Sequence, residues 1–245
     1  MRATLMIGTT LLMLAGTAKA ALLTGYVGIL DASTGASIGY ISNTPDAGGL
    51  FVTTMDPSKR LEVAFSDVAG PFSMLAFNDS GNATTPFLGG IQGINSSTPN
   101  LAIGSGNYAI VVGTAQTLAC AKPTPSANSF IPYFDPVSRL RNAESAVWSL
   151  SKSGTLSAQW VNSDGSLPRT SIVLSQDILA PAESVLVLTA DPAASAVIFG
   201  PGPTVVLKFI PADMPAGSPR RKFGWPDSDR ACNPSAPYSL PSRTW

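Results

Sequence analysis

The side chains that could carry out chemistry in this 245-residue sequence are carboxylates and hydroxyls, because the sequence contains no histidine. Without an imidazole to act as general base, Ser-His-Asp and Cys-His nucleophilic systems are excluded in their usual form. Histidine-based zinc, copper and iron sites are excluded too, and two cysteines are too few for a four-thiolate site. Neither common phosphate-binding glycine motif is present, so we expect no cofactor and no metal.

Paired carboxylates are the catalytic arrangement that the composition still permits, since a glycosidase needs only two aspartate or glutamate side chains. Glutamate occurs three times, at Glu62, Glu144 and Glu183. The aspartates mostly follow turn patterns, as at Asp31 and Asp164, where a carboxylate that hydrogen-bonds its own turn is the simpler interpretation. We therefore favour a non-catalytic protein and keep a carboxylate-dependent glycoside hydrolase as the alternative.

Two of the four tryptophans, Trp148 and Trp160, lie in the segment AVWSLSKSGTLSAQW. A turn over 152–154, with its glycine in the left-handed conformation, makes this segment a β-hairpin. The alternation of the hairpin then places both indoles on one apolar face, with Trp148 opposite Ala158, and we expect core positions for them. The alternative is a sugar-binding platform at Trp160, where Gln159 supplies a neighbouring amide.

A long irregular stretch over 113–143 contains four prolines and several aromatic residues. Loops of this length inside a compact domain often carry function. Phe130 and Tyr133 are therefore candidate ligand-binding residues. The alternative is a covering loop that packs these rings on the sheet.

The first twenty residues have the pattern of a secretory signal peptide, with Arg2, an apolar run and a small-x-small site that ends at Ala20. The apolar run is shorter than the ~20 residues that a membrane span needs. No later stretch is long and apolar enough either, so we expect no membrane anchor and no membrane partner. The mature protein is expected to be secreted and extracellular.

Passage through the secretory pathway would allow disulfide formation at the cysteines and N-glycosylation at three asparagines. In an oxidising compartment Cys120 and Cys232 can form a disulfide, and the sequence leaves equally open a Cys232 that lies in a loose tail and pairs elsewhere or not at all. Three N-x-S/T motifs predict glycosylation at Asn78, Asn82 and Asn95.

The charge balance argues against a polyanionic partner. Charged residues make up 12% of the sequence, about half of the ~25% of typical soluble domains. Removal of the signal peptide takes away Arg2 and Lys19, which leaves 13 basic residues against 15 acidic ones. The sequence contains no basic patch in its main body, so nucleic acid is not expected as a partner.

Short β-branched and aromatic runs, separated by Gly, Asn, Asp, Ser and Pro clusters, predict an all-β domain over 21–212. The expected strands are 24–30, 36–42, 50–55, 61–66, 72–77, 107–113, 146–150, 156–162, 170–175, 184–190, 195–200 and 204–210. We expect a single antiparallel β-sandwich or jelly-roll-like domain, with a β-trefoil as the alternative. Residues 213–245 are expected to form a disordered, proline-rich basic tail.

The segments GYVGI, TGASIGYISN, PFSMLAFN and ESAVWSLSKSGTLSAQWVNSDGSLPRTSIVL resemble a group of small secreted proteins from basidiomycete fungi whose function is uncharacterised. The resemblance covers 22–211 and is most specific over 144–174. It implies a fungal, extracellular, β-rich protein, and it brings no catalytic residues with it.

Secretion, glycosylation and low charge together predict a non-catalytic protein of the extracellular matrix or cell wall. We expect it to bind extracellular glycans weakly through exposed aromatic side chains. The alternatives are the glycoside hydrolase and a purely structural or interaction protein without a ligand.

Overall fold

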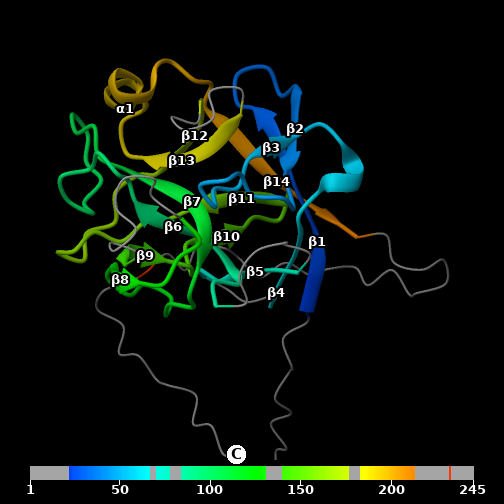
Figure 1. Ribbon diagram of the computed structural model, residues 1–245, viewed down its shortest axis with the longest axis horizontal. Coiled ribbons are helices and arrows are strands. Elements are labelled where there is room, and N and C mark those ends of the chain that lie inside the picture. The colour runs from blue at the N-terminus through cyan, green and yellow to red at the C-terminus, as the bar shows by residue number, and fades with distance from the viewer. Residues whose placement is uncertain are drawn as a thin grey trace, which may run out of the picture.

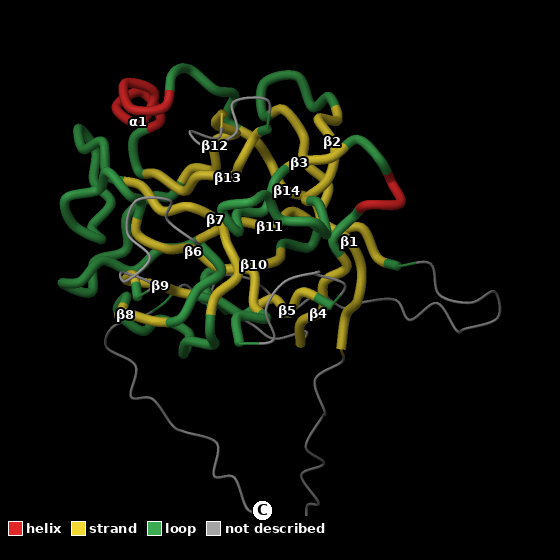
Figure 2. The backbone as a smooth tube through the Cα atoms, viewed as in Figure 1, coloured by secondary structure: helices red, strands yellow, loops and turns green. Residues whose placement is uncertain are grey.

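The structure is a computed structural model that describes residues 22–66, 70–77, 84–130, 140–176, 183–212 and 232. The described chain is mostly strand, and the predicted all-β, antiparallel class is confirmed (Figures 1 and 2). The elements are β1 (Leu22–Asp31), β2 (Ser37–Ile41), β3 (Thr53–Thr54), η1 (Pro57–Lys59), β4 (Glu62–Ser66), β5 (Met74–Ala76), β6 (Phe87–Gln92), β7 (Tyr108–Thr114), β8 (Thr124–Ser126), β9 (Arg141–Glu144), β10 (Trp148–Leu150), β11 (Thr155–Ala158), β12 (Ser171–Gln176), β13 (Ser184–Thr189), α1 (Pro192–Phe199) and β14 (Val205–Pro211).

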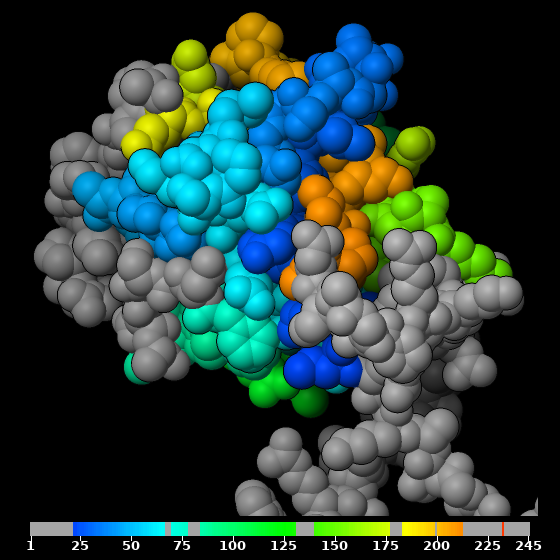
Figure 3. All heavy atoms as spheres, turned by 90° about the vertical axis from the view of Figure 1, so that its right-hand side faces the viewer, coloured from blue at the N-terminus to red at the C-terminus, as the bar shows by residue number. Residues whose placement is uncertain are grey.

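The strands join one curled antiparallel sheet with the order β10-β11-β14-β1-β4-β5-β6-β7-β13-β12, to which the remaining strands attach at the side. The sheet curls because the strand at each end of this order also pairs with a residue next to one of the inner strands. Val173 of β12 pairs with Thr204, just before β14, and Trp148 of β10 pairs with Phe72, just before β5. Figure 3 shows β14, in orange, between the blue N-terminal strands and the green β10–β11 hairpin.

The curled sheet holds its apolar residues in two clusters, and β7 and β13 contribute to both. In β13, Leu186 belongs to the main core while Val187 belongs to a second cluster. In β7, Val111 belongs to the main core while Ile110 belongs to the second cluster. Strands buried on both faces are expected to have uninterrupted apolar sequences, as these two have.

The β1–β2 hairpin forms with the turn chemistry that its sequence predicts. The Asp31 side chain accepts hydrogen bonds from the backbone N–H groups of Ser33 and Thr34, at 2.9 and 2.8 Å. Gly35 follows with φ of 70°, which a glycine adopts without steric cost.

The β10–β11 hairpin also has the predicted register, with Trp148 opposite Ala158 and Leu150 opposite Leu156. Gly154 has φ of 76° and closes the turn, as expected. The hairpin leaves Ser149 and Ser157 facing each other across the two strands on the opposite face.

The prediction of a strand over 195–200 is wrong, because residues 195–199 lie in α1 and Gly200 is its C-cap. The Asp191 side chain accepts hydrogen bonds from the N–H groups of Ala193 and Ala194, and Pro192 starts the helix. An Asp N-cap followed by proline is a strong helix start. Here these local signals override the β-branched residues that suggested a strand.

The sequence analysis also missed β6, β8 and β9. β6 contains Gly89 and Gly90, and glycine lowered its apparent strand propensity. A side chain at Gly90 would come within 3.0 Å of the Trp160 ring, so the glycine permits close packing. β8 lies within 113–143 and β9 begins there, so the prediction of an entirely irregular stretch is wrong.

The choice between a sandwich and a trefoil stays a prediction. The signal peptide over 1–20 and the tail over 213–245, apart from Cys232, lie outside the described residues. None of the helices in the described part of the chain has the length and hydropathy to span a bilayer.

Candidate functional site

The two hairpin tryptophans are core residues. Both Trp148 and Trp160 have an exposed fraction of 0%. The indole N–H of Trp148 donates to the carbonyl of Leu88 at 2.7 Å, and that of Trp160 donates to the carbonyl of Pro99 at 2.8 Å. A buried ring whose N–H is already paired offers no face to a sugar. The core prediction is confirmed, and the predicted platform at Trp160 is wrong.

The candidate aromatic residues of the 113–143 stretch do not form an exposed platform in the described structure. Phe130 is 1% exposed and packs in the second cluster, near Val112 and Val185. The guanidinium carbon of Arg141 lies 5.6 Å from the centre of its ring. The ligand-binding prediction for Phe130 is therefore wrong, and its ring acts as a cover for the sheet. Tyr133 lies outside the described residues.

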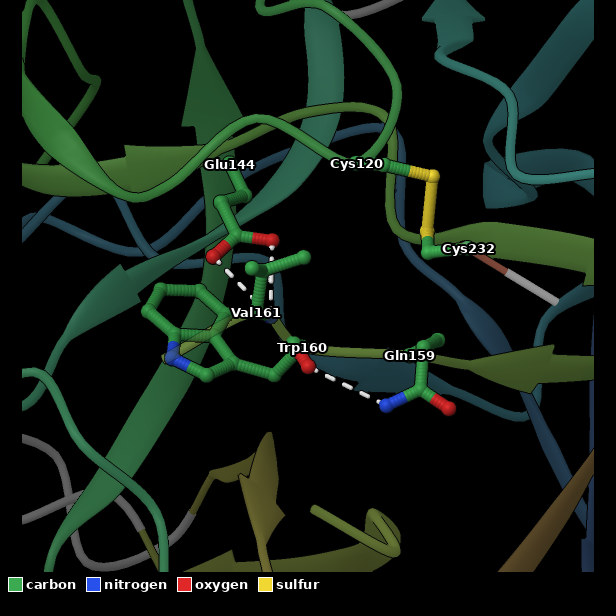
Figure 4. Close-up of a disulfide and its surroundings, with 6 residues drawn as sticks. All are labelled: Cys120, Glu144, Gln159, Trp160, Val161 and Cys232. Carbon is green, nitrogen blue, oxygen red and sulfur yellow. Dashed lines mark hydrogen bonds between the residues drawn. A yellow bond between two sulfur atoms is a disulfide. The ribbon is translucent and has the colours of Figure 1, made fainter. Parts of the chain in front are cut away.

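Gln159, another predicted ligand-binding residue, borders a cleft. Its side-chain nitrogen donates to the carbonyl of Trp160 at 3.1 Å (Figure 4). The same nitrogen donates to the carbonyl of Pro168 at 2.9 Å. These two bonds use both amide hydrogens and fix the orientation of the amide. The side-chain oxygen of Gln159 is thereby held in place as a hydrogen-bond acceptor.

The cleft beside Gln159 has a volume of about 280 Å³ and is called the polar cleft below. Its hydrogen-bonding lining comes from β10, β11 and the segment before β12, and consists of Ser149, Ser151, Ser157, Gln159, Arg169 and Thr170. Pro71 and Leu150 add apolar surface. Among the described residues, the lining contains no carboxylate, and its only ionisable side chain is that of the exposed Arg169.

Apart from Arg169, the polar cleft presents neutral donors and acceptors, among which the Gln159 amide is held in place. Ser149 and Ser157 face each other across the hairpin, and neither hydroxyl makes a hydrogen bond with the part of the chain that the structure describes. The Thr170 hydroxyl is held against the carbonyl of Pro168 at 3.2 Å. A small number of positioned neutral polar groups on a rigid sheet suits a polyhydroxylated ligand without charge.

Glu144 is a buried acid that sits apart from the polar cleft. It is 3% exposed, and both carboxyl oxygens accept from the Val161 N–H, at 3.1 and 3.2 Å (Figure 4). Burial raises the pKa of Glu144 to about 9, and the bond from Val161 only partly opposes this rise. The side chain is therefore neutral at pH 7, and it cannot act there as a carboxylate nucleophile.

Several exposed aspartates have structural roles in turns and caps. Hydrogen bonds from Ser33 and Thr34 lower the pKa of Asp31 to about 2, and bonds from Ser166 lower the pKa of Asp164. Such shifts arise when donors stabilise a carboxylate in its own turn. In the portion of the chain with described coordinates, no group of three or more His, Cys, Asp or Glu side chains could hold a metal ion.

The disulfide between Cys120 and Cys232, one of the two outcomes that the sequence leaves open, is present (Figure 4). It joins residues 112 positions apart and links Cys232 to the loop between β7 and β8. Cys120 has φ of 59°, and it is the only described non-glycine residue with positive φ. Such a conformation persists where surrounding structure enforces it.

Of the three predicted glycosylation sites, Asn95 is described and is exposed in the turn after β6. Its backbone N–H donates to the Tyr108 hydroxyl at 3.2 Å, which positions the turn and leaves the side chain toward solvent. Asn78 and Asn82 lie outside the described residues.

The sequence analysis missed the contributions of Arg169, Thr170 and Pro71 to the polar cleft. The alternation of the hairpin does indicate the position of Ser149 and Ser157, because it places them on the polar face opposite the tryptophans. No local pattern joins Pro71 to that face, because the contact depends on the pairing of Phe72 with Trp148.

Comparison with known proteins gives no match to any protein-family model, curated protein or solved structure. The resemblance to secreted basidiomycete proteins therefore stays a prediction.

Proposed function

We propose that this protein is a secreted, non-catalytic protein of the extracellular matrix or cell wall that binds neutral glycans weakly at the polar cleft. The observation that carries the proposal is the hydrogen-bonding lining around the fixed amide of Gln159, in which the exposed Arg169 is the one charged side chain among the described residues. Binding through hydroxyl and amide groups replaces the aromatic platform expected from the sequence.

Two further features support an extracellular setting. Disulfides such as Cys120–Cys232 persist in oxidising compartments. Asn95 stands in an exposed turn, where an N-linked glycan can be accommodated without disturbing the fold. The fungal origin and the cell-wall association are inferred from the resemblance and from the composition.

Binding of the mature protein to a glycan array and to insoluble polysaccharides tests the proposal. Ser157→Phe places a large ring in the polar cleft from an exposed position on β11 and is expected to abolish retention. The matched control Ser37→Phe changes an exposed serine at the start of β2, outside the polar cleft, and is expected to bind normally.

Equal retention of both variants would overturn the assignment of the site to the polar cleft. If the folded wild-type protein retains no glycan, the binding function is refuted, and the structural or interaction role becomes the better account.

A further inference from the structure

A second cavity lies next to the polar cleft and differs from it in chemistry. It has a volume of about 380 Å³, within the range of roughly 300–1,000 Å³ typical of small-molecule sites. Its largest apolar lining residues are Leu22, Phe65, Phe72, Leu75, Phe87 and Leu118. We call it the apolar cavity.

No Asp, Glu, Lys or Arg side chain of the described residues lines the apolar cavity. Phe65 and Phe72 stack with ring centres 4.3 Å apart and give it a rigid aromatic wall. Leu118, which is 69% exposed, lies at the edge where the cavity meets solvent. Burial of an alkyl chain against such a surface is favourable because the chain and the wall both leave water.

Two of the four polar side chains that line the apolar cavity, those of Ser73 and Thr117, are used by the protein itself. The Ser73 hydroxyl lies 2.7 Å from the Ser145 hydroxyl, and the Thr117 hydroxyl accepts from the Ser145 N–H at 2.8 Å. Because these groups already have partners, they favour an apolar ligand over a strongly hydrated one.

The two cavities share a wall at Pro71, which lines both. The backbone of the next residue, Phe72, pairs with that of Trp148 in both directions, with N···O distances of 2.8 and 3.3 Å. Along the same segment, Ala146 lines the apolar cavity and Ser149 lines the polar cleft. A ligand that crosses Pro71 therefore meets neutral hydrogen-bonding groups on one side and an apolar surface on the other.

We propose that the natural ligand is an amphiphile, a neutral sugar that carries an alkyl chain, with the sugar in the polar cleft and the chain in the apolar cavity. The proposal rests on the proposed glycan-binding function and names the class of ligand. The sugar contributes specificity through hydrogen bonds, and the chain contributes most of the affinity. This division accounts for a polar cleft that lacks an aromatic platform.

Isothermal titration calorimetry with methyl, butyl and hexyl β-D-glucoside tests whether the alkyl chain adds affinity to that of the sugar. All three compounds are used below their critical micelle concentrations. Affinity is expected to rise by a factor of about three to four for each methylene added, until the chain fills the cavity. Hexanol, which has the chain without the sugar, is expected to bind more weakly than hexyl glucoside.

Leu118→Glu places a charge at the edge of the apolar cavity from an exposed position and is expected to remove the dependence on chain length. The matched control Ile103→Glu changes another exposed residue, 86% exposed and not part of the lining, and is expected to retain that dependence. Thermal melting of both variants checks that they are folded.

The outcomes separate the two proposals. Equal affinity for methyl and hexyl glucoside refutes the amphiphile and leaves glycan binding intact. Hexanol binding as tightly as hexyl glucoside, with no affinity for methyl glucoside, contradicts both the amphiphile and glycan binding. The absence of binding by any compound in the series overturns the amphiphile, and the glycan array then decides the proposed function independently.

Discussion

Replacement of the buried acid by its neutral amide, Glu144→Gln, is expected to remove a pH-dependent loss of stability. Burial raises the pKa of Glu144 from 4.5 to about 9 in the folded protein, whereas the unfolded chain keeps an ordinary carboxyl group. Between these two values the folded state binds more protons than the unfolded state does. The free energy of unfolding therefore falls as the pH rises through this range.

The size of this loss in the free energy of unfolding depends on how far the pH of the measurement lies above the ordinary pKa of 4.5. Each pH unit above the ordinary value costs about 1.4 kcal/mol while the folded group stays protonated. At pH 7 the acid therefore costs on the order of 3 kcal/mol of stability. The amide that Glu144→Gln introduces cannot ionise, and its oxygen can still accept from the Val161 N–H.

Urea unfolding of wild type and Glu144→Gln at pH 4, 5.5, 7 and 8 measures the difference directly. At pH 4 the two proteins are expected to differ by about 1 kcal/mol or less, the usual net value of one hydrogen bond. As the pH rises, the free energy of unfolding of Glu144→Gln is expected to increase steadily relative to that of the wild type. A difference that is constant from pH 4 to pH 8 would refute the inference that Glu144 is protonated in the folded protein.

Three further predictions concern the disulfide, a turn and a glycosylation site. Cys120→Ser is expected to lower the free energy of unfolding by about 4–5 kcal/mol, measured with denaturant, because the bond closes a long loop; a loss equal to zero would contradict its structural role. Gly49→Ala is expected to destabilise more than Gly35→Ala in thermal melts, since both have positive φ but only at Gly49 would the new methyl group meet a backbone oxygen, that of Ser129; equal losses would contradict the packing argument. Asn95→Gln is expected to remove one glycan from the secreted protein in intact mass measurements, and an unchanged mass would show that the site is not modified.

Local features of this fold could be predicted from the sequence. The register of the β10–β11 hairpin follows from alternation and from Gly154, and both act between residues close in the chain. The turn at Asp31 is equally local. By contrast, the segment of α1 carries two conflicting local signals, an apolar run that favours a strand and an Asp191 N-cap with Pro192 that favours a helix, and the capping signal determines the structure.

The arrangement of the two cavities could not be predicted, because it depends on contacts between distant segments. Pro71 reaches the polar cleft only through the pairing of Phe72 with Trp148, which lie 76 positions apart in the sequence. The burial of Phe130 likewise depends on β7 and β13, which form the surface that its ring covers. Aromatic residues in a loop have the same local pattern whether they cover a core or face solvent.

The central claim, that a neutral ligand binds at the polar cleft, is tested most directly by NMR. Backbone amide shifts of the isotopically labelled mature protein are recorded during titration with the glycan that the array retains best. We expect the largest shifts at Ser149, Ser157 and Gln159, with little change at Ile103 on the loop near α1. Shifts that cluster away from the β10–β11 hairpin, or no shifts at saturating glycan, would contradict the account.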